Sequence, residues 1–168
     1  MEIVKSLNGL TISAAQEGLA KCCAARGWVS EMLSRRPFAS DDDLLAAAKE
    51  VWWSLSPESW VEAFAAHPSI GDLKTLREKF ANTQKWAAHE QAGVQAASEE
   101  TLQCLAVENR KYLDKFGYQF IICATGKTAD EILAALERRL ANNAAIELPI
   151  AAAEQLNITR LRLQKLFS

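Results

Sequence analysis

Histidine, cysteine and long apolar runs are all scarce in this 168-residue chain. No apolar run reaches the roughly 18 residues that a membrane-spanning helix needs, so we expect no contact with a membrane. The four cysteines form no C-x-x-C pair, and two histidines are too few for a zinc-finger spacing. We therefore expect no metal, and free, mostly buried thiols that act as small hydrophobes.

An excess of one charge is also missing. The chain has 19 Lys and Arg against 21 Asp and Glu, which gives a formal net charge of −2. A protein that binds nucleic acid usually carries a basic patch, so we expect no nucleic-acid partner. The two ends carry no secretory signal, peroxisomal address or lipidation motif, and we expect a cytoplasmic protein.

Several common catalytic motifs are absent as well. There is no G-x-S-x-G elbow, no dinucleotide fingerprint and no H-E-x-x-H. The tripeptide 126–128 is like the tail of a phosphate loop, but Ile121 occupies the place of that loop's first glycine. We therefore interpret Gly126 to Thr128 as the start of a helix.

Helix signals are what the sequence has in abundance. Apolar residues recur at steps of three and four, as in Ile132, Leu136 and Leu140. Helix-capping residues precede such stretches at Ser13, Ser40, Ser56, Ser98 and Thr128. Length and composition suit one domain over residues 1–168. We predict an all-α, compact, bundle-like domain of seven to nine helices, near residues 13–25, 28–35, 41–54, 57–66, 73–80, 84–95, 98–115, 128–141 and 147–166.

Residues 116–125 break the helical pattern. The stretch from Phe116 to Ala124 is a continuous apolar run with a glycine and β-branched residues, which is compatible with a buried strand. No second strand offers itself as a partner, and a lone strand is not stable. We predict an irregular or partly helical buried connection.

His67 is the first candidate for catalysis. Pro68 disfavours helical conformation in the residue before it, so a helix should end at His67 and present the imidazole there. The alternative is a histidine that stabilises a helix C-terminus through the dipole. His89 and Glu90 are both expected inside a helix, where adjacent residues point to different faces. For each of them, the alternative to a catalytic role is an exposed position on the surface.

Arg160 and Arg162 are expected on the last helix. They are separated by about 200° around its axis, so they cannot point the same way and one of them could face inward. An inward guanidinium would suit a carboxylate or ureido group through paired hydrogen bonds.

Together these residues resemble the OHCU decarboxylase family, whose substrate is 2-oxo-4-hydroxy-4-carboxy-5-ureidoimidazoline (OHCU). The matching blocks run nearly from end to end: Arg36-Pro37-Phe38, His67-Pro68-x-Ile70-Gly71-Asp72, Glu90-Gln91-Ala92-Gly93, Lys115-Phe116-Gly117-Tyr118, Ala124-Thr125-Gly126-Lys127 and Ile158-Thr159-x-Leu161-Arg162-Leu163. The resemblance implies a helical homodimer without a cofactor that converts OHCU to (S)-allantoin in urate degradation.

The resemblance also implies which residues form the site. His67 and Glu90 would be catalytic, and Arg162 would bind the substrate by its charge. The other implied substrate contacts are Pro68, Ala87, Gln91, Phe120, Ile121, Ile122 and Ala124, the last four through a stretch that offers backbone groups to the ring.

Two positions depart from the family pattern. Ala87 stands where the family commonly has a serine that contacts the substrate, and Ser69 stands where an arginine or another polar residue is common. The loss of one hydroxyl contact costs about 1 kcal/mol of binding, which weakens an enzyme without abolishing its activity. Two alternatives stay open: a catalytically weak or inactive helical binding protein, and a related lyase that acts on another ureido acid.

Overall fold

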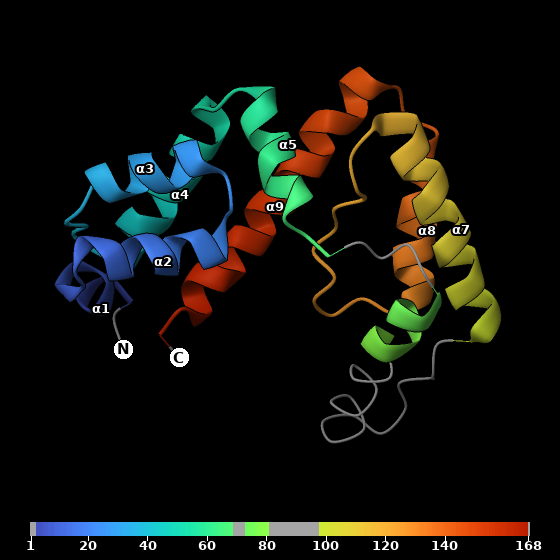
Figure 1. Ribbon diagram of the computed structural model, residues 1–168, viewed down its shortest axis with the longest axis horizontal. Coiled ribbons are helices and arrows are strands. Elements are labelled where there is room, and N and C mark those ends of the chain that lie inside the picture. Colours follow the sequence, from blue (N-terminus) through green and yellow to red (C-terminus); the bar gives the residue numbers. More distant parts are fainter. Residues whose placement is uncertain (1–2, 69–72, 81–97, 168) are drawn as a thin grey trace. The chain divides into compact units, whose positions relative to one another are not determined.

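The computed structural model describes residues 3–68, 73–80 and 98–167 (Figure 1). Every regular element in these ranges is helical, which confirms the prediction of an all-α fold. The helices are α1 (Ile3–Gly9), α2 (Ile12–Cys22), α3 (Arg26–Ser34), α4 (Asp41–Ser54), α5 (Pro57–Ala65), α7 (Glu99–Phe116), α8 (Ala129–Leu140) and α9 (Ala144–Lys165). Residues 73–80 are also helical, as predicted, whereas the helix expected at 84–95 lies outside the described residues.

Three helices begin with a side-chain cap at the residue predicted from the sequence. Ser40 and Ser98 each accept a hydrogen bond from a backbone N–H in the first turn of α4 and α7. Thr128 and Glu131 form a reciprocal capping box at the start of α8. These caps confirm that residues 126–128 lead into a helix.

The predicted cap of α2 was wrong. The helix begins at Ile12, and Thr11, not Ser13, accepts the hydrogen bond from the N–H of Ala14, at 3.2 Å. Ser13 already lies inside the first turn. Either hydroxyl has a suitable sequence context, and Thr11 is placed so that its oxygen reaches the third residue of the helix.

Two further boundaries differ from the prediction. Helix α1 was not predicted, because it is short and has no capping motif; its N–H at Val4 donates to the side chain of Asp41 at 2.9 Å. Helix α9 begins at Ala144, before the predicted start at residue 147, because Asn143 caps it by accepting from the N–H of Ile146.

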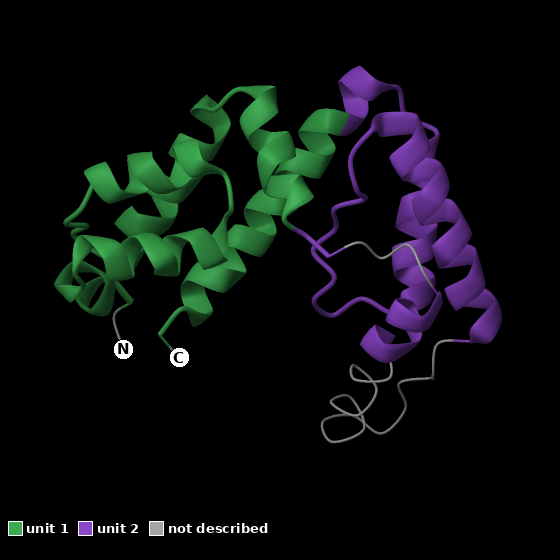
Figure 2. Ribbon diagram, in the orientation of Figure 1, with its two compact units in different colours: residues 1–66, 148–168 green, residues 67–147 purple. Residues whose placement is uncertain are grey.

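The described residues form two compact units, coloured separately in Figure 2: residues 1–66 with 148–168, and residues 67–147. In the first unit, α2 packs against α3, and α4 packs against both α3 and α1. Trp28 and Trp52 fill its core, and their indole N–H groups donate to the carbonyl oxygens of Ala48 at 3.1 Å and Ala152 at 2.9 Å. Each buried indole therefore has its polar atom satisfied.

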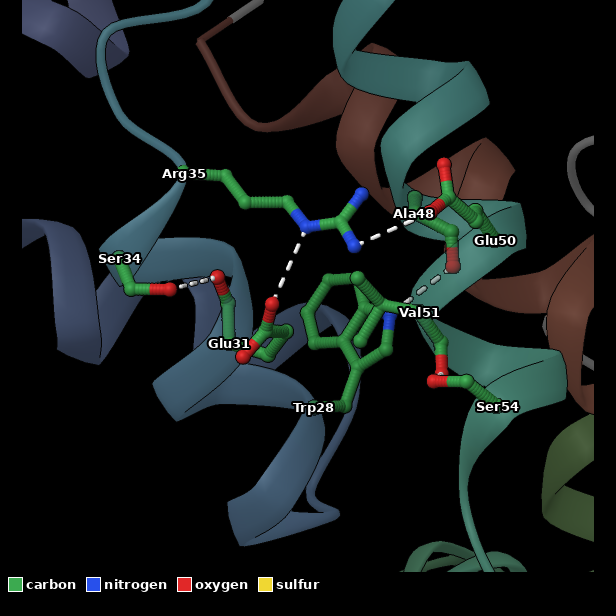
Figure 3. A network of polar contacts seen from close by, with 8 residues as sticks. All are labelled: Trp28, Glu31, Ser34, Arg35, Ala48, Glu50, Val51 and Ser54. Atoms are coloured by element: carbon green, nitrogen blue, oxygen red, sulfur yellow. Dashed lines mark hydrogen bonds and ion pairs between the residues drawn. The ribbon is translucent and has the colours of Figure 1, made fainter.

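A polar network covers the edge of this core (Figure 3). Arg35 donates to Glu31 at 3.2 Å and to Glu50 at 3.1 Å, which joins the end of α3 to α4. The hydrogen bond from Arg35 lowers the pKa of the Glu50 carboxyl. The groups are solvent-exposed, so the network contributes little to stability.

The second unit is built on the packing of α7 against α8. Its core contains Leu105, Tyr112 and Leu136, with Leu76 and Phe80 from the helical residues 73–80. Residues 117–128, between α7 and α8, contain no helix or strand, which confirms the irregular connection predicted for 116–125. None of the described helices is both long enough and apolar enough to cross a membrane.

Candidate active site

His67 follows the end of α5, as the proline after it predicts. The helix ends at Ala65, and the N–H of Ala66 closes its last turn by donating to the carbonyls of Ala63 and Phe64. His67 is half-buried and Pro68 is exposed. The imidazole therefore lies directly after the C-terminal end of α5.

The connection between α7 and α8 begins and ends with glycines in left-handed conformation. Gly117 has φ of 79° and ends α7 by donating to the carbonyl of Leu113 at 2.8 Å, and Gly126 has φ of 76°. Only glycine adopts this conformation without strain, so these two residues allow the chain to turn sharply at both ends. Between them lie the four predicted substrate contacts Phe120, Ile121, Ile122 and Ala124.

A buried ion pair holds this connection in place. Arg139 of α8 donates from Nη1 to the carbonyl oxygen of Ile121 at 2.7 Å and from Nε to Glu147 at 2.7 Å. Glu147 is fully buried, and its carboxylate also accepts from the hydroxyl of Tyr112 at 2.6 Å and the amide of Asn142 at 3.0 Å. Both buried charges are therefore paired and hydrogen-bonded, as low-dielectric burial requires.

Aromatic rings complete this cluster. The guanidinium carbon of Arg139 lies 4.4 Å from the ring centroid of Phe120 and 5.9 Å from that of Tyr112. Burial and the hydrogen bond to Glu147 raise the pKa of Tyr112, so its hydroxyl stays protonated and donates. The Phe120 side chain is thus packed against a fixed cation.

The backbone groups of the connection differ in whether the described residues use them. Among the described residues, no hydrogen-bond acceptor is within reach of the N–H groups of Phe120, Ile121, Ile122 and Ala124. The carbonyls are in part used: that of Ile121 by Arg139, and that of Ala124 by the N–H of Lys127 at 3.0 Å. Oriented N–H groups of this kind suit the oxygen atoms of a small anion.

Arg162 lies in the other unit, on α9. It is exposed, and its Nη1 is 3.5 Å from the carbonyl oxygen of Lys21, a long contact. Both Arg160 and Arg162 are exposed in the structure. Thr159 and Leu163, on either side of the two arginines in the sequence, are buried.

The remaining predicted site residues, Ala87, Glu90 and Gln91, lie outside the described residues, as do His89 and Ser69. The structure therefore brings together Phe120, Ile121, Ile122 and Ala124 on one held segment. The meeting of His67, Glu90 and Arg162 stays a prediction.

Three residues of this cluster were not among the predicted site residues: Tyr112, Arg139 and Glu147. Nothing local marks them: Arg139 follows another arginine, and Glu147 is one of 21 acidic residues. They meet only because α7, α8 and the start of α9 pack together, across separations of up to 35 residues.

The chain matches known proteins over most of its length. The family model for OHCU decarboxylase matches residues 8–164. The chain is 36% identical over 148 residues to the uric acid degradation bifunctional protein TTL of Arabidopsis thaliana, a match that covers 88% of this chain and 45% of that protein. It is 32% identical over 142 residues to 2-oxo-4-hydroxy-4-carboxy-5-ureidoimidazoline decarboxylase of Haloferax volcanii, which covers 84% of this chain and 82% of that protein.

Solved structures agree. A crystal structure of OHCU decarboxylase in the presence of (S)-allantoin aligns with a TM-score of 0.71 and 36% identity, and the match covers 88% of this chain and 95% of that one. A crystal structure of (S)-allantoin synthase has the same TM-score of 0.71 at 20% identity, which shows likeness of fold alone. The chain belongs to the OHCU decarboxylase family.

Proposed function

We propose that this chain decarboxylates OHCU to (S)-allantoin in the degradation of urate. The observation that carries the proposal is the family match over residues 8–164, a range that contains every residue assigned to the site. Although the chain spans 45% of the length of the Arabidopsis relative, it spans 82% of the Haloferax decarboxylase. The match includes both compact units and α9, which belongs to both, and this supports one catalytic domain over the whole chain.

The substrate supplies its own electron sink. When the bond between the ring carbon and the carboxylate breaks, carbon dioxide leaves. The electron pair of that bond forms a double bond between this carbon and the neighbouring ring carbon, which bears the ureido group. The electrons of the ring C=N bond at that second carbon move onto its nitrogen, which takes a proton. The neighbouring hydroxyl then becomes a carbonyl as it loses its proton, and the ureido-bearing carbon takes a proton on one face. The reaction as written needs no oxidant and no cofactor; the enzyme has to orient the substrate and direct one proton.

His67 and Glu90 share this proton handling in our proposal. An acid or base held within reach of the reacting atom contributes roughly 10²–10⁴-fold to the rate. The position of His67, two residues after the end of α5 and half-buried, supports the assignment, because part of the imidazole stays accessible.

The other residues bind the substrate. Arg162 pairs with the carboxylate, Gln91 donates to or accepts from the ring, and Pro68 and Ala87 contact it. Among the described residues, the exposed guanidinium of Arg162 makes only a long contact with the carbonyl oxygen of Lys21, so an anion can displace that contact. The segment from Phe120 to Ala124 offers its backbone N–H groups to ring and ureido oxygens.

The test is to generate OHCU in solution from urate and to follow allantoin by circular dichroism. An OHCU decarboxylase produces optically active (S)-allantoin faster than the spontaneous reaction, which gives a racemate. An inactive helical binding protein leaves the spontaneous rate unchanged. Ala87 is the residue that supports this alternative. A lyase for another ureido acid also leaves it unchanged but accelerates loss of carbon dioxide from that acid.

The oligomeric state and location belong to the same proposal. We infer a homodimer, for which light scattering coupled to size exclusion should give twice the chain mass of 18.5 kDa. A mass of one chain at assay concentrations contradicts this. Fractionation of cells should place the protein in the cytoplasm, and recovery in a membrane or organelle fraction would contradict that assignment.

A further inference from the structure

Residues 117–128 contain no helix or strand, so side-chain contacts contribute to the shape of this segment. Ile121 is nevertheless only 2% exposed. The guanidinium of Arg139 donates to the Ile121 carbonyl oxygen at 2.7 Å, and its carbon lies 4.4 Å from the centroid of the Phe120 ring. Arg139 therefore determines which way this carbonyl points.

The direction of one carbonyl determines the direction of the next N–H. The peptide bond between Ile121 and Ile122 is trans and planar, so the carbonyl of one and the N–H of the other point to opposite sides. Because the carbonyl points toward Arg139, the N–H of Ile122 points away from it. Within the described residues, that N–H has no acceptor.

Glu147 prevents Arg139 from turning. Its Oε1 accepts from Nε of Arg139 at 2.7 Å, lies 2.6 Å from Nη2, and accepts from the Tyr112 hydroxyl at 2.6 Å. Arg139 is 8% exposed and Glu147 is 0% exposed, so a rotation of the guanidinium would leave a buried carboxylate unpaired. Nε and Nη2 thus face Glu147, while Nη1 donates to the carbonyl of the loop.

We propose that Arg139 and Glu147 are positioning residues that aim the N–H of Ile122 at a carbonyl or carboxylate oxygen of the ureido-acid substrate. This inference rests on the proposed function. Neither side chain touches the substrate. They act through the peptide group between Ile121 and Ile122.

The first test compares Arg139→Lys with Arg138→Lys. Lysine keeps the charge and can pair with Glu147, but it lacks the planar fork that holds the Ile121 carbonyl at the same time. Arg138 is the adjacent residue of α8 and is exposed, so its replacement is a matched control. We expect Arg139→Lys to raise KM for OHCU about tenfold with kcat within about twofold of wild type, the pattern for loss of a binding contact. Arg138→Lys should leave both unchanged.

A purely structural role gives a different pattern, namely a lower fraction of active protein with unchanged KM. A folded Arg139→Lys variant with wild-type KM overturns the proposal. If that variant does not fold, Tyr112→Phe decides, since it removes one hydrogen bond to Glu147 and keeps the ring. A smaller rise in KM is then expected, and an unchanged KM overturns the proposal.

The second test observes the Ile122 amide by NMR in protein labelled with ¹⁵N-isoleucine. (S)-allantoin should shift the Ile122 resonance in wild type and in Arg138→Lys, but not in Arg139→Lys. An unmoved Ile122 resonance in wild-type protein that binds (S)-allantoin overturns the proposal. If wild type neither turns over OHCU nor binds (S)-allantoin, the proposed function fails. In that case, the spectrum of the free protein tests whether Arg139 positions the peptide group of Ile122. Arg139→Lys must then displace the Ile122 resonance more than Arg138→Lys does. Equal spectra overturn the positioning role.

Discussion

At the scale of single residues, two exposed arginines on α9 distinguish the effect of overall positive charge from that of a direct ion pair. Arg160 and Arg162 carry the same charge two residues apart, and only Arg162 is assigned to the substrate. Long-range attraction of an anion would depend on both residues. A direct pair with a carboxylate depends on Arg162 alone.

Arg162→Gln should therefore raise KM for OHCU at least tenfold, because a charge-assisted pair is worth about 1.5–3 kcal/mol. Arg160→Gln is the matched control and should change KM by less than about twofold. Steady-state kinetics by circular dichroism measures both. Equal effects of the two substitutions would mean that only the overall charge of the helix matters.

A substitution of Ala87 can be tested for improved binding of the substrate. If its position faces the substrate, Ala87→Ser supplies a hydroxyl that should lower KM about fivefold, which corresponds to about 1 kcal/mol. The same kinetics measures it. A KM that does not fall would remove Ala87 from the list of substrate contacts.

Adjacent cysteines lie buried where α2 ends. Burial raises the pKa of both Cys22 and Cys23 from an ordinary 9.0 to about 11. Only the thiolate reacts with alkylating reagents, so at pH 8 the folded protein presents about a hundredfold less thiolate at these residues than the unfolded chain.

At pH 8, iodoacetamide should therefore modify exposed Cys104 in the native protein and reach Cys22 and Cys23 only after denaturation. Mass spectrometry of peptides measures this order. Between pH 9 and 11 the folded state keeps protons that the unfolded state loses, so the two thiols make stability fall as pH rises through that window. Modification of all three residues at equal rates would contradict the burial.

At the scale of elements, helix starts were the best-predicted features. Local chemistry decides them: a hydroxyl before a first turn of acidic residues identified α4, α7 and α8, and Pro68 identified the end of α5. Helix α1 has no such signal, since it depends on Asp41, which is 37 residues away from Val4. The start of α2 was misassigned because two hydroxyls, Thr11 and Ser13, compete for one role.

Replacement of these two residues by alanine tests the correction. Thr11→Ala should lower the free energy of unfolding by about 1 kcal/mol, because an N–H of the first turn loses its acceptor. Ser13→Ala should leave it within about 0.5 kcal/mol. Urea denaturation followed by circular dichroism measures both. A larger loss for Ser13→Ala would restore Ser13 as the cap.

At the scale of the whole molecule, the candidate site was predictable only in part. The composition of the block from Phe116 to Ala124 predicted an irregular segment, since the sequence offers no second strand with which it could pair. What holds the segment is a pair of charges, Arg139 and Glu147, that the packing of three helices buries together. Such a pair cannot be found by local periodicity, because each member looks like a surface residue until the helices are placed.

In the proposed reaction, the formation of (S)-allantoin by this chain depends on His67. The most direct measurement is the initial rate of (S)-allantoin formation, followed by circular dichroism with OHCU generated from urate, for wild type and for folded His67→Asn. Asparagine cannot exchange a proton near neutral pH, so the account predicts that the variant loses at least about a hundredfold in kcat/KM. A His67→Asn variant that forms (S)-allantoin at the wild-type rate would contradict it.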